Sequence, residues 1–134
     1  MHQAFYESNE HNHAVVHLHS THATALSCTF SDNTWTLPHL TPYSVMRLGH
    51  EIGVVPYVKP GDPQLAQEIR KVARHSTAVL MRNHGIATAG RSLNAAANAA
   101  EEFEQAAKIY LLLNVNQHQI DPLTQADVDE LARL

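Results

Sequence analysis

The chain has 134 residues, of which 44% are hydrophobic and 16% charged, a balance typical of one globular domain rather than a disordered segment. A formal net charge of −4 argues against a nucleic-acid or anionic-membrane partner, and no apolar run approaches the ~18 residues of a membrane span. The single cysteine, Cys28, excludes a disulfide within the chain, and the start lacks a signal-peptide pattern, so we expect a cytoplasmic protein.

The first part of the chain predicts a helix, a strand and a second helix. Residues 1–9 resemble the last turns of a helix, although nothing precedes them to begin it. Residues 13–19 alternate and are rich in valine, which favours a strand. Residues 20–28 predict a short helix with Ser20 as its N-cap, and the turn-forming residues 29–38 predict a loop.

The middle of the chain predicts a helix, a strand and another helix. Thr41 and Pro42 suit the start of a helix, and Gly49 suits its end. Residues 52–58 are apolar and rich in valine, as expected of a strand. Asp62 then predicts the N-cap of an amphipathic helix.

The last part predicts two strands and two helices. Residues 77–83 and 85–90 are short apolar runs separated by a turn. Ser92 opens a long helix with an alanine-rich apolar face, and Thr124 opens the final helix with Asp127 as its capping-box partner. This mixture of helices and strands predicts one α/β or α+β domain.

Histidine is unusually frequent, because eleven histidines exceed the nine lysines and arginines combined. Four of them lie in the ten-residue stretch HAVVHLHSTH, which ends at His22. Residues i and i+2 of a strand point to the same side, so His17 and His19 are expected to project together. Two imidazoles do not complete a metal site, and a pair of exposed histidines on a half-solvated strand is the alternative.

His84 is the best candidate for a third ligand. It follows a buried strand and precedes Gly85, at the tip of a turn where accessible functional residues concentrate; a turn histidine bonded to backbone is the alternative. Three neutral imidazoles with one open position form a catalytic zinc site, in which the metal acts as a Lewis acid. Cys28 is a weaker candidate, since a lone cysteine in an apolar helix is more often a core residue. His22, one turn beyond His19, is expected to line the same pocket.

These motifs resemble a known family. The segment AVVHLHSTHATALS, followed about sixty residues later by VLMRNHGIATAGRSLNAAANAAEEFEQAAKIYLLL, is similar to the class II aldolase/adducin family of zinc-dependent sugar-phosphate lyases and epimerases. The resemblance implies an αβα-layered α/β fold, with a central, mostly antiparallel sheet flanked by helices, in a single domain at residues 1–134. It also implies one Zn²⁺ per subunit, bound by His17, His19 and His84, and a homotetramer.

Three segments, HLHSTHATALSC, LTPYSVMRLG and VPYVKPGDPQLA, resemble the branch of the family that decarboxylates 3-oxo-tetronate 4-phosphates. This implies a lyase of carbohydrate metabolism that converts a small phosphorylated sugar acid to dihydroxyacetone phosphate and CO₂. An aldolase for a ketose 1-phosphate of the fuculose or rhamnulose type is the alternative, because the same ligands serve both reactions. The aromatic residue that fuculose-phosphate aldolases carry near Pro60 is absent here, which argues against that alternative.

The resemblance also concerns the remaining catalytic residues. Tyr43 lies near the position of a tyrosine that, in fuculose-phosphate aldolases, reaches into the active site of a neighbouring subunit; packing at a helix start is the alternative. The E-x-x-x-H pattern of the family falls with its histidine on His2, so the acid/base glutamate is expected upstream of Met1, as is the phosphate-binding loop. The chain therefore resembles the C-terminal portion of the family domain, N-terminally truncated. Alone it is expected to show little or no activity, and a catalytically inactive or adducin-like module is a third interpretation.

Overall fold

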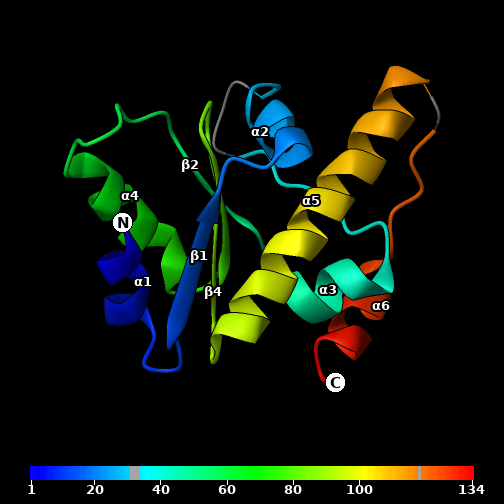
Figure 1. Cartoon of the computed structure of the whole chain (residues 1–134). Coiled ribbons are helices and arrows are strands. Elements are labelled where there is room, and N and C mark those ends of the chain that lie inside the picture. Colours follow the sequence, from blue (N-terminus) through cyan, green and yellow to red (C-terminus); the bar gives the residue numbers. More distant parts are fainter. Residues whose placement is uncertain (31–33, 118) are drawn as a thin grey trace.

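Residues 1–30, 34–117 and 119–134 are described by a computed structural model, in which helices cover both faces of one sheet (Figure 1). The helices are α1 (His2–Ser8), α2 (Thr21–Ser27), α3 (Pro42–Leu48), α4 (Gln64–Ala73), α5 (Leu93–Val115) and α6 (Gln125–Leu131). The strands are β1 (Ala14–Leu18), β2 (Gly53–Val55), β3 (Ala78–Met81) and β4 (Gly85–Gly90).

The sheet has four strands in the order β1-β4-β3-β2. β1 pairs antiparallel with β4, and β4 pairs antiparallel with β3, while β2 and β3 are parallel. The predicted α/β fold with a mostly antiparallel central sheet is therefore confirmed. The three layers are visible in Figure 1, where α1 and α4 lie on one side of the sheet and α2, α5, α3 and α6 lie on the other.

Among the described residues, two hydrophobic clusters pack against the sheet, one on each face. Alternate residues of β3 divide between them, because successive side chains of a strand point to opposite faces. Leu80 belongs to the cluster under α5, around Phe103, and Val79 belongs to the cluster under α1 and α4, around Phe5 and Ile69. β3 is thus buried on both sides, which explains its continuous apolar sequence. No helix within the described ranges is long and apolar enough to cross a membrane.

The predicted helix starts are largely confirmed, because their caps are local. The side chains of Thr41 and Ser92 each accept a hydrogen bond from the backbone N–H three residues later. Thr124 and Asp127 form the predicted capping box of α6. The predicted N-cap Asp62 lies one residue before the observed N-cap, Pro63, although its carboxylate accepts a hydrogen bond from the backbone N–H of Gln64.

Two further predictions need correction, and a third concerns a segment that the structure describes only in part. Ser20 precedes α2, but its side chain makes no capping hydrogen bond. The strand expected at 52–58 is shorter, since Pro56, which has no N–H to donate, follows β2 directly. The described residues of the predicted loop at 29–38 lie in neither a helix nor a strand, and residues 31–33 are outside the described part.

Candidate metal centre

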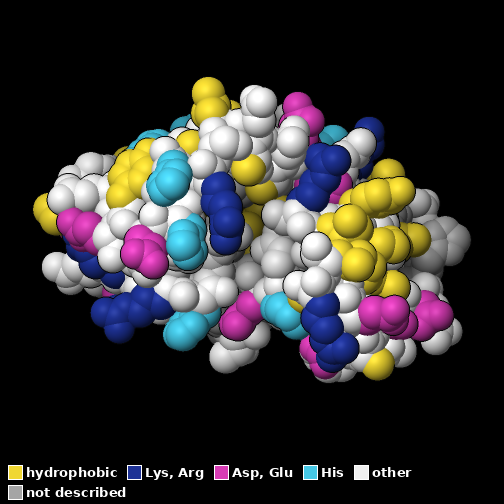
Figure 2. All heavy atoms as spheres, turned by 90° about the horizontal axis from the view of Figure 1, so that it is seen from below, with side chains coloured by type: hydrophobic (Ala, Val, Ile, Leu, Met, Phe, Trp, Pro, Cys, Tyr) yellow, Lys and Arg dark blue, Asp and Glu magenta, His cyan; other side chains and the backbone are white. Residues whose placement is uncertain are grey.

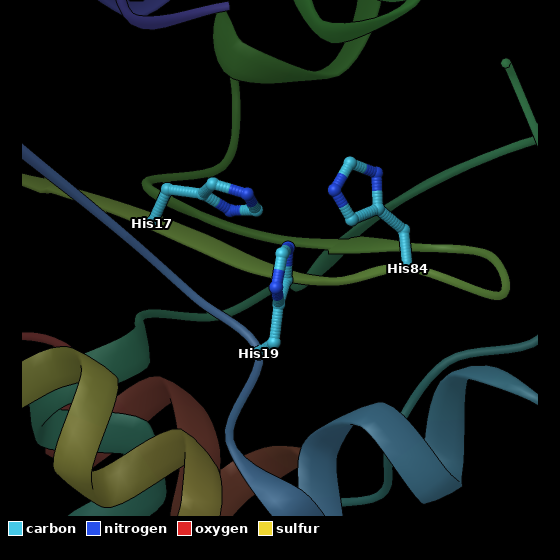
Figure 3. Close-up of side chains that lie close together, drawn as sticks. All are labelled: His17, His19 and His84. Carbon is cyan, nitrogen blue, oxygen red and sulfur yellow. The ribbon is translucent and has the colours of Figure 1, made fainter. Parts of the chain in front are cut away.

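Three histidines converge where β1 ends and the hairpin between β3 and β4 turns (Figure 3). His17 belongs to β1, His19 lies just beyond its last residue, and His84 directly precedes β4. The ring centroid of His17 is 4.8 Å from that of His19, and both rings are 5.0 Å from the ring of His84. One ligand nitrogen from each residue lies within 4.8 Å of the other two. The structure therefore brings the three predicted ligands together around one point.

The register of the sheet explains this convergence. In the antiparallel pair of β1 and β4, His17 lies opposite Ala87 and Leu18 lies opposite Ile86. The residue that precedes β4, His84, is consequently held beside the residue that follows β1, His19. A one-residue change of register would turn every side chain of β1 to the other face and destroy the cluster.

The turn around His84 depends on its two neighbours. Asn83 adopts a left-handed conformation with φ of 53°, which asparagine tolerates better than most residues. A Cβ atom on Gly85 would lie 2.5 Å from the carbonyl oxygen of Leu18 and 3.0 Å from Cδ2 of His19. Glycine is therefore required for β4 to approach the end of β1 this closely. The Asn-His-Gly sequence serves to place the imidazole of His84 against the other two.

A hydrogen bond sets the orientation of the first imidazole. Nδ1 of His17 lies 2.7 Å from the carbonyl oxygen of Ile86. A carbonyl can only accept, so Nδ1 carries the proton, and Nε2 of the neutral ring is the atom free to bind a metal. A backbone carbonyl that holds the second nitrogen is the usual support of a metal-binding histidine.

The electrostatics of the cluster favour neutral rings. Burial lowers the pKa of His17, as does the proximity of His19, and together these effects outweigh the opposing hydrogen bond to Ile86. Burial also lowers the pKa of His84, and the nearby His17 and His19 lower it further. Both rings are therefore neutral at pH 7, the form in which histidine binds metals. The donor set and its protonation state fit a divalent metal ion.

The other predicted residues lie outside the cluster. Tyr43 is 62% exposed on α3, which packs against α5 and α6 and lies away from the end of β1, where the three histidines meet (Figure 1). His22 lies on α2, where its Nδ1 is 2.7 Å from a carboxylate oxygen of Glu104. Cys28 is exposed, which contradicts the expected core position, and it is not part of the metal-binding group.

Glu104 is the functional candidate that the sequence did not reveal. Its carboxylate accepts hydrogen bonds from the backbone N–H groups of His22 and Ala23, more than eighty residues earlier in the chain. The one local signal is its position on α5 between Ala100 and Ala107, where a charged residue borders an apolar stripe. Such a signal indicates a partnered carboxylate but does not identify the partner.

Known proteins share both the sequence and the fold. Residues 1–111 match the sequence model of the Class II Aldolase and Adducin N-terminal domain. Over 131 residues the chain is 43% identical to 3-oxo-tetronate 4-phosphate decarboxylase from Escherichia coli (strain K12), a match that covers 97% of this chain and 60% of that protein. The crystal structure of YgbL from Escherichia coli superposes with a TM-score of 0.89 at 42% identity, covering 98% of this chain and 62% of that one.

A structure of L-fuculose 1-phosphate aldolase superposes almost as well. Its TM-score is 0.87 at 31% identity, and the match covers 98% of this chain and 59% of that one. The chain thus spans about 60% of the length of the curated relatives that it matches.

Proposed function

Because the chain belongs to the class II aldolase and adducin family, we propose that it is a zinc-dependent carbon–carbon lyase that decarboxylates a 3-oxo-tetronate 4-phosphate to dihydroxyacetone phosphate and CO₂. The observation that carries this proposal is the convergence of His17, His19 and His84. The 43% identity to a decarboxylase of this substrate class supports the choice of reaction. We further propose that residues 1–134 form one domain, that the protein assembles as a homotetramer and that it acts in the cytoplasm.

The three histidines are the residues that would hold the metal. Imidazole nitrogens suit Zn²⁺, and three of them leave a coordination position for substrate or water. When bound, zinc would supply a Lewis acid that offsets the negative charge developing beside a ketone. His17, fixed by its bond to Ile86, and His84, fixed by its turn, would contribute by being preorganised as neutral donors.

The reaction requires one bond to break and one proton to be added. When the bond between the carboxyl carbon and C2 of the 3-oxo acid breaks, CO₂ departs and its electron pair remains as an enediolate. Protonation at C2 then gives dihydroxyacetone phosphate. We assign this proton donation to Tyr43 in the site of a neighbouring subunit, since Tyr43 is 62% exposed and α3 lies away from the end of β1, where the histidines of its own chain meet (Figure 1).

A second candidate function is an aldolase for a ketose 1-phosphate. The TM-score of 0.87 to L-fuculose 1-phosphate aldolase favours it, because the fold and the metal site would serve aldol cleavage equally well. The lower identity, 31% against 43%, places it second. A non-catalytic module is a third candidate, against which the histidine cluster argues.

Product analysis separates these candidates. The zinc-loaded protein is incubated with a 3-oxo-tetronate 4-phosphate and, separately, with fuculose 1-phosphate, and CO₂, aldehyde and dihydroxyacetone phosphate are measured. Release of CO₂ that is lost in His84→Ala supports the decarboxylase. An aldehyde formed without CO₂ supports the aldolase. No turnover of either substrate by the zinc-loaded protein, either as residues 1–134 alone or extended upstream of Met1, would contradict a catalytic role and favour the module.

A further inference from the structure

Glu104 lies outside the metal centre, yet it holds the helix that joins two of the ligand segments. We propose that Glu104 is a positioning residue of the metal centre, which acts through α2 on His19 and His84. This inference rests on the metal centre of the proposed function and adds to it a residue of α5 that, in the described part of the chain, has no hydrogen bond to the three ligands.

α2 connects the two ligand segments in space. Its first residue, Thr21, comes two positions after His19. Its last residue, Ser27, accepts a hydrogen bond from the backbone N–H of Asn83 at 3.0 Å, and Asn83 directly precedes His84. A displacement of α2 would therefore move the backbone on both sides of the cluster.

The N-terminus of α2 has no cap from its own segment. The side chain of Ser20, at the N-cap position, makes no capping hydrogen bond. Glu104 supplies the acceptors instead: Oε1 lies 2.8 Å from the backbone nitrogen of His22 and 2.7 Å from its Nδ1, and Oε2 lies 2.9 Å from the backbone nitrogen of Ala23. Both carboxylate oxygens are used: they accept from two backbone N–H groups that have no partner within α2, and from Nδ1 of His22.

The charge of Glu104 and the packing of α2 both hold α2 firmly against α5. Burial raises the pKa of Glu104, but hydrogen bonds, chiefly from the backbone N–H groups of His22 and Ala23, outweigh it and lower the pKa overall. The group is thus a carboxylate at neutral pH, and its bonds are charge-assisted. Ala23 and Leu26 are fully buried against the cluster that contains Phe103 of α5, so α2 is fixed to α5 by packing as well.

The contacts argue for positioning and against a proton relay. Within residues 1–30, 34–117 and 119–134, no hydrogen bond joins Glu104 or His22 to His17, His19 or His84. The Nδ1 atom of His22 is engaged with Glu104 and does not extend the network toward the ligands. Glu104 is therefore placed to hold a backbone segment.

The test is the affinity of the chain for Co²⁺, measured by titration of its visible absorption, which also reports coordination geometry. Glu104→Gln keeps the size of the side chain but has one acceptor oxygen, so a backbone N–H of α2 must face an amide N–H. We expect Co²⁺ affinity to fall by about tenfold or more, toward the ~10–100-fold range seen when supports of metal ligands are removed. The absorption band should also change in shape.

Two control variants separate positioning from general stability. Glu101→Gln changes an exposed glutamate one turn earlier on α5 and should leave Co²⁺ affinity unchanged. Thr124→Ala removes the cap of the distant α6 and should lower the melting temperature without weakening Co²⁺ binding. Glu104→Asp keeps the charge but shortens the reach, and it should show a smaller loss than Glu104→Gln.

The outcomes are distinguishable. If the native chain binds Co²⁺ and folded Glu104→Gln binds it equally well, the positioning role is wrong while the metal centre stands. If Glu104→Gln does not fold, native affinity in Glu104→Asp overturns the role in the same way. If Thr124→Ala weakens Co²⁺ binding as much as Glu104→Gln does, Glu104 acts only through stability. If the native chain binds no Co²⁺, the metal centre itself is wrong and this inference fails with it.

Discussion

His17 and His84 are suited to metal binding because the fold keeps their imidazoles partly buried and close to one another. Burial opposes a positive charge on either ring, and each nearby imidazole adds to that opposition. The hydrogen bond between Nδ1 of His17 and Ile86 then selects the nitrogen that faces the cluster. The neutral state of both rings and the tautomer of His17 are thus set by the surrounding residues alone.

The lowered pKa values predict the titration of the metal-free protein. The C2 protons of His17 and His84, followed by NMR, should titrate below the ordinary histidine value of 6.5. The unfolded chain then binds protons first as the pH falls through 6.5, so the free energy of unfolding should decrease over that window. Titration of both rings at or above 6.5 would contradict neutral, preorganised ligands.

Gly85 offers a second test at the scale of one residue. Gly85→Ala places a Cβ against Leu18 and His19, so we expect a loss of stability and weaker zinc binding. Gly61→Ala is the matched control, because Gly61 also has a positive φ, of 87°, but its Cβ would meet no atom within 4 Å. Urea unfolding and zinc titration compare the two variants. Equal zinc affinity in Gly85→Ala and Gly61→Ala would show that the close approach does not shape the site.

Among the helices and strands, contacts between residues close together in the sequence could be predicted, whereas contacts between residues far apart in the sequence could not. The caps by Ser92 and Thr124 were predictable because each bonds a backbone N–H three residues later. The cap of α2 was not, because its acceptor, Glu104, is more than eighty residues away and no local pattern points to it. The predicted ligands combine a local relation with a distant one. The spacing of His17 and His19 is local, whereas the contact with His84 depends on the register of β1 with β4.

Two serines at helix starts should therefore differ in their contribution to stability. Ser92→Ala removes a formed capping bond of α5 and should lower the free energy of unfolding by about 1 kcal/mol. Ser20→Ala should lower it much less, because Glu104 already satisfies the N-terminus of α2. Urea unfolding of both variants measures the difference. A loss at Ser20 as large as that at Ser92 would contradict capping of α2 from α5.

At the scale of the whole molecule, the core could be predicted from the sequence, whereas the assembly could not. A sheet that is apolar on both faces requires helices on both sides, which is why the α/β layers could be predicted from the apolar strands. Assembly leaves no such pattern in the sequence, and the homotetramer remains a prediction from family resemblance. The molecule shows hydrophobic side chains on the side where α3 and α6 lie (Figure 2). On α3, Tyr43 is 62% and Met46 is 53% exposed.

If α3 contacts a neighbouring subunit, a charge on it should disrupt assembly. Met46→Lys is expected to shift the protein toward smaller species, because a lysine charge would be buried against the partner. Gln67→Lys, at an exposed polar position on α4, is the control and should leave assembly unchanged. Light scattering coupled to gel filtration gives the mass of each variant. The native mass in Met46→Lys would exclude this face of α3 from the interface.

The central claim, that three histidines form a zinc site, is tested most directly by elemental analysis of the purified protein. One zinc per chain is expected for the native sequence and for His75→Ala, which changes an exposed histidine outside the cluster. His84→Ala should contain almost none, because two imidazoles do not hold the ion firmly. A native chain that folds but contains no zinc, or a His84→Ala variant that retains a full equivalent, would contradict the metal centre.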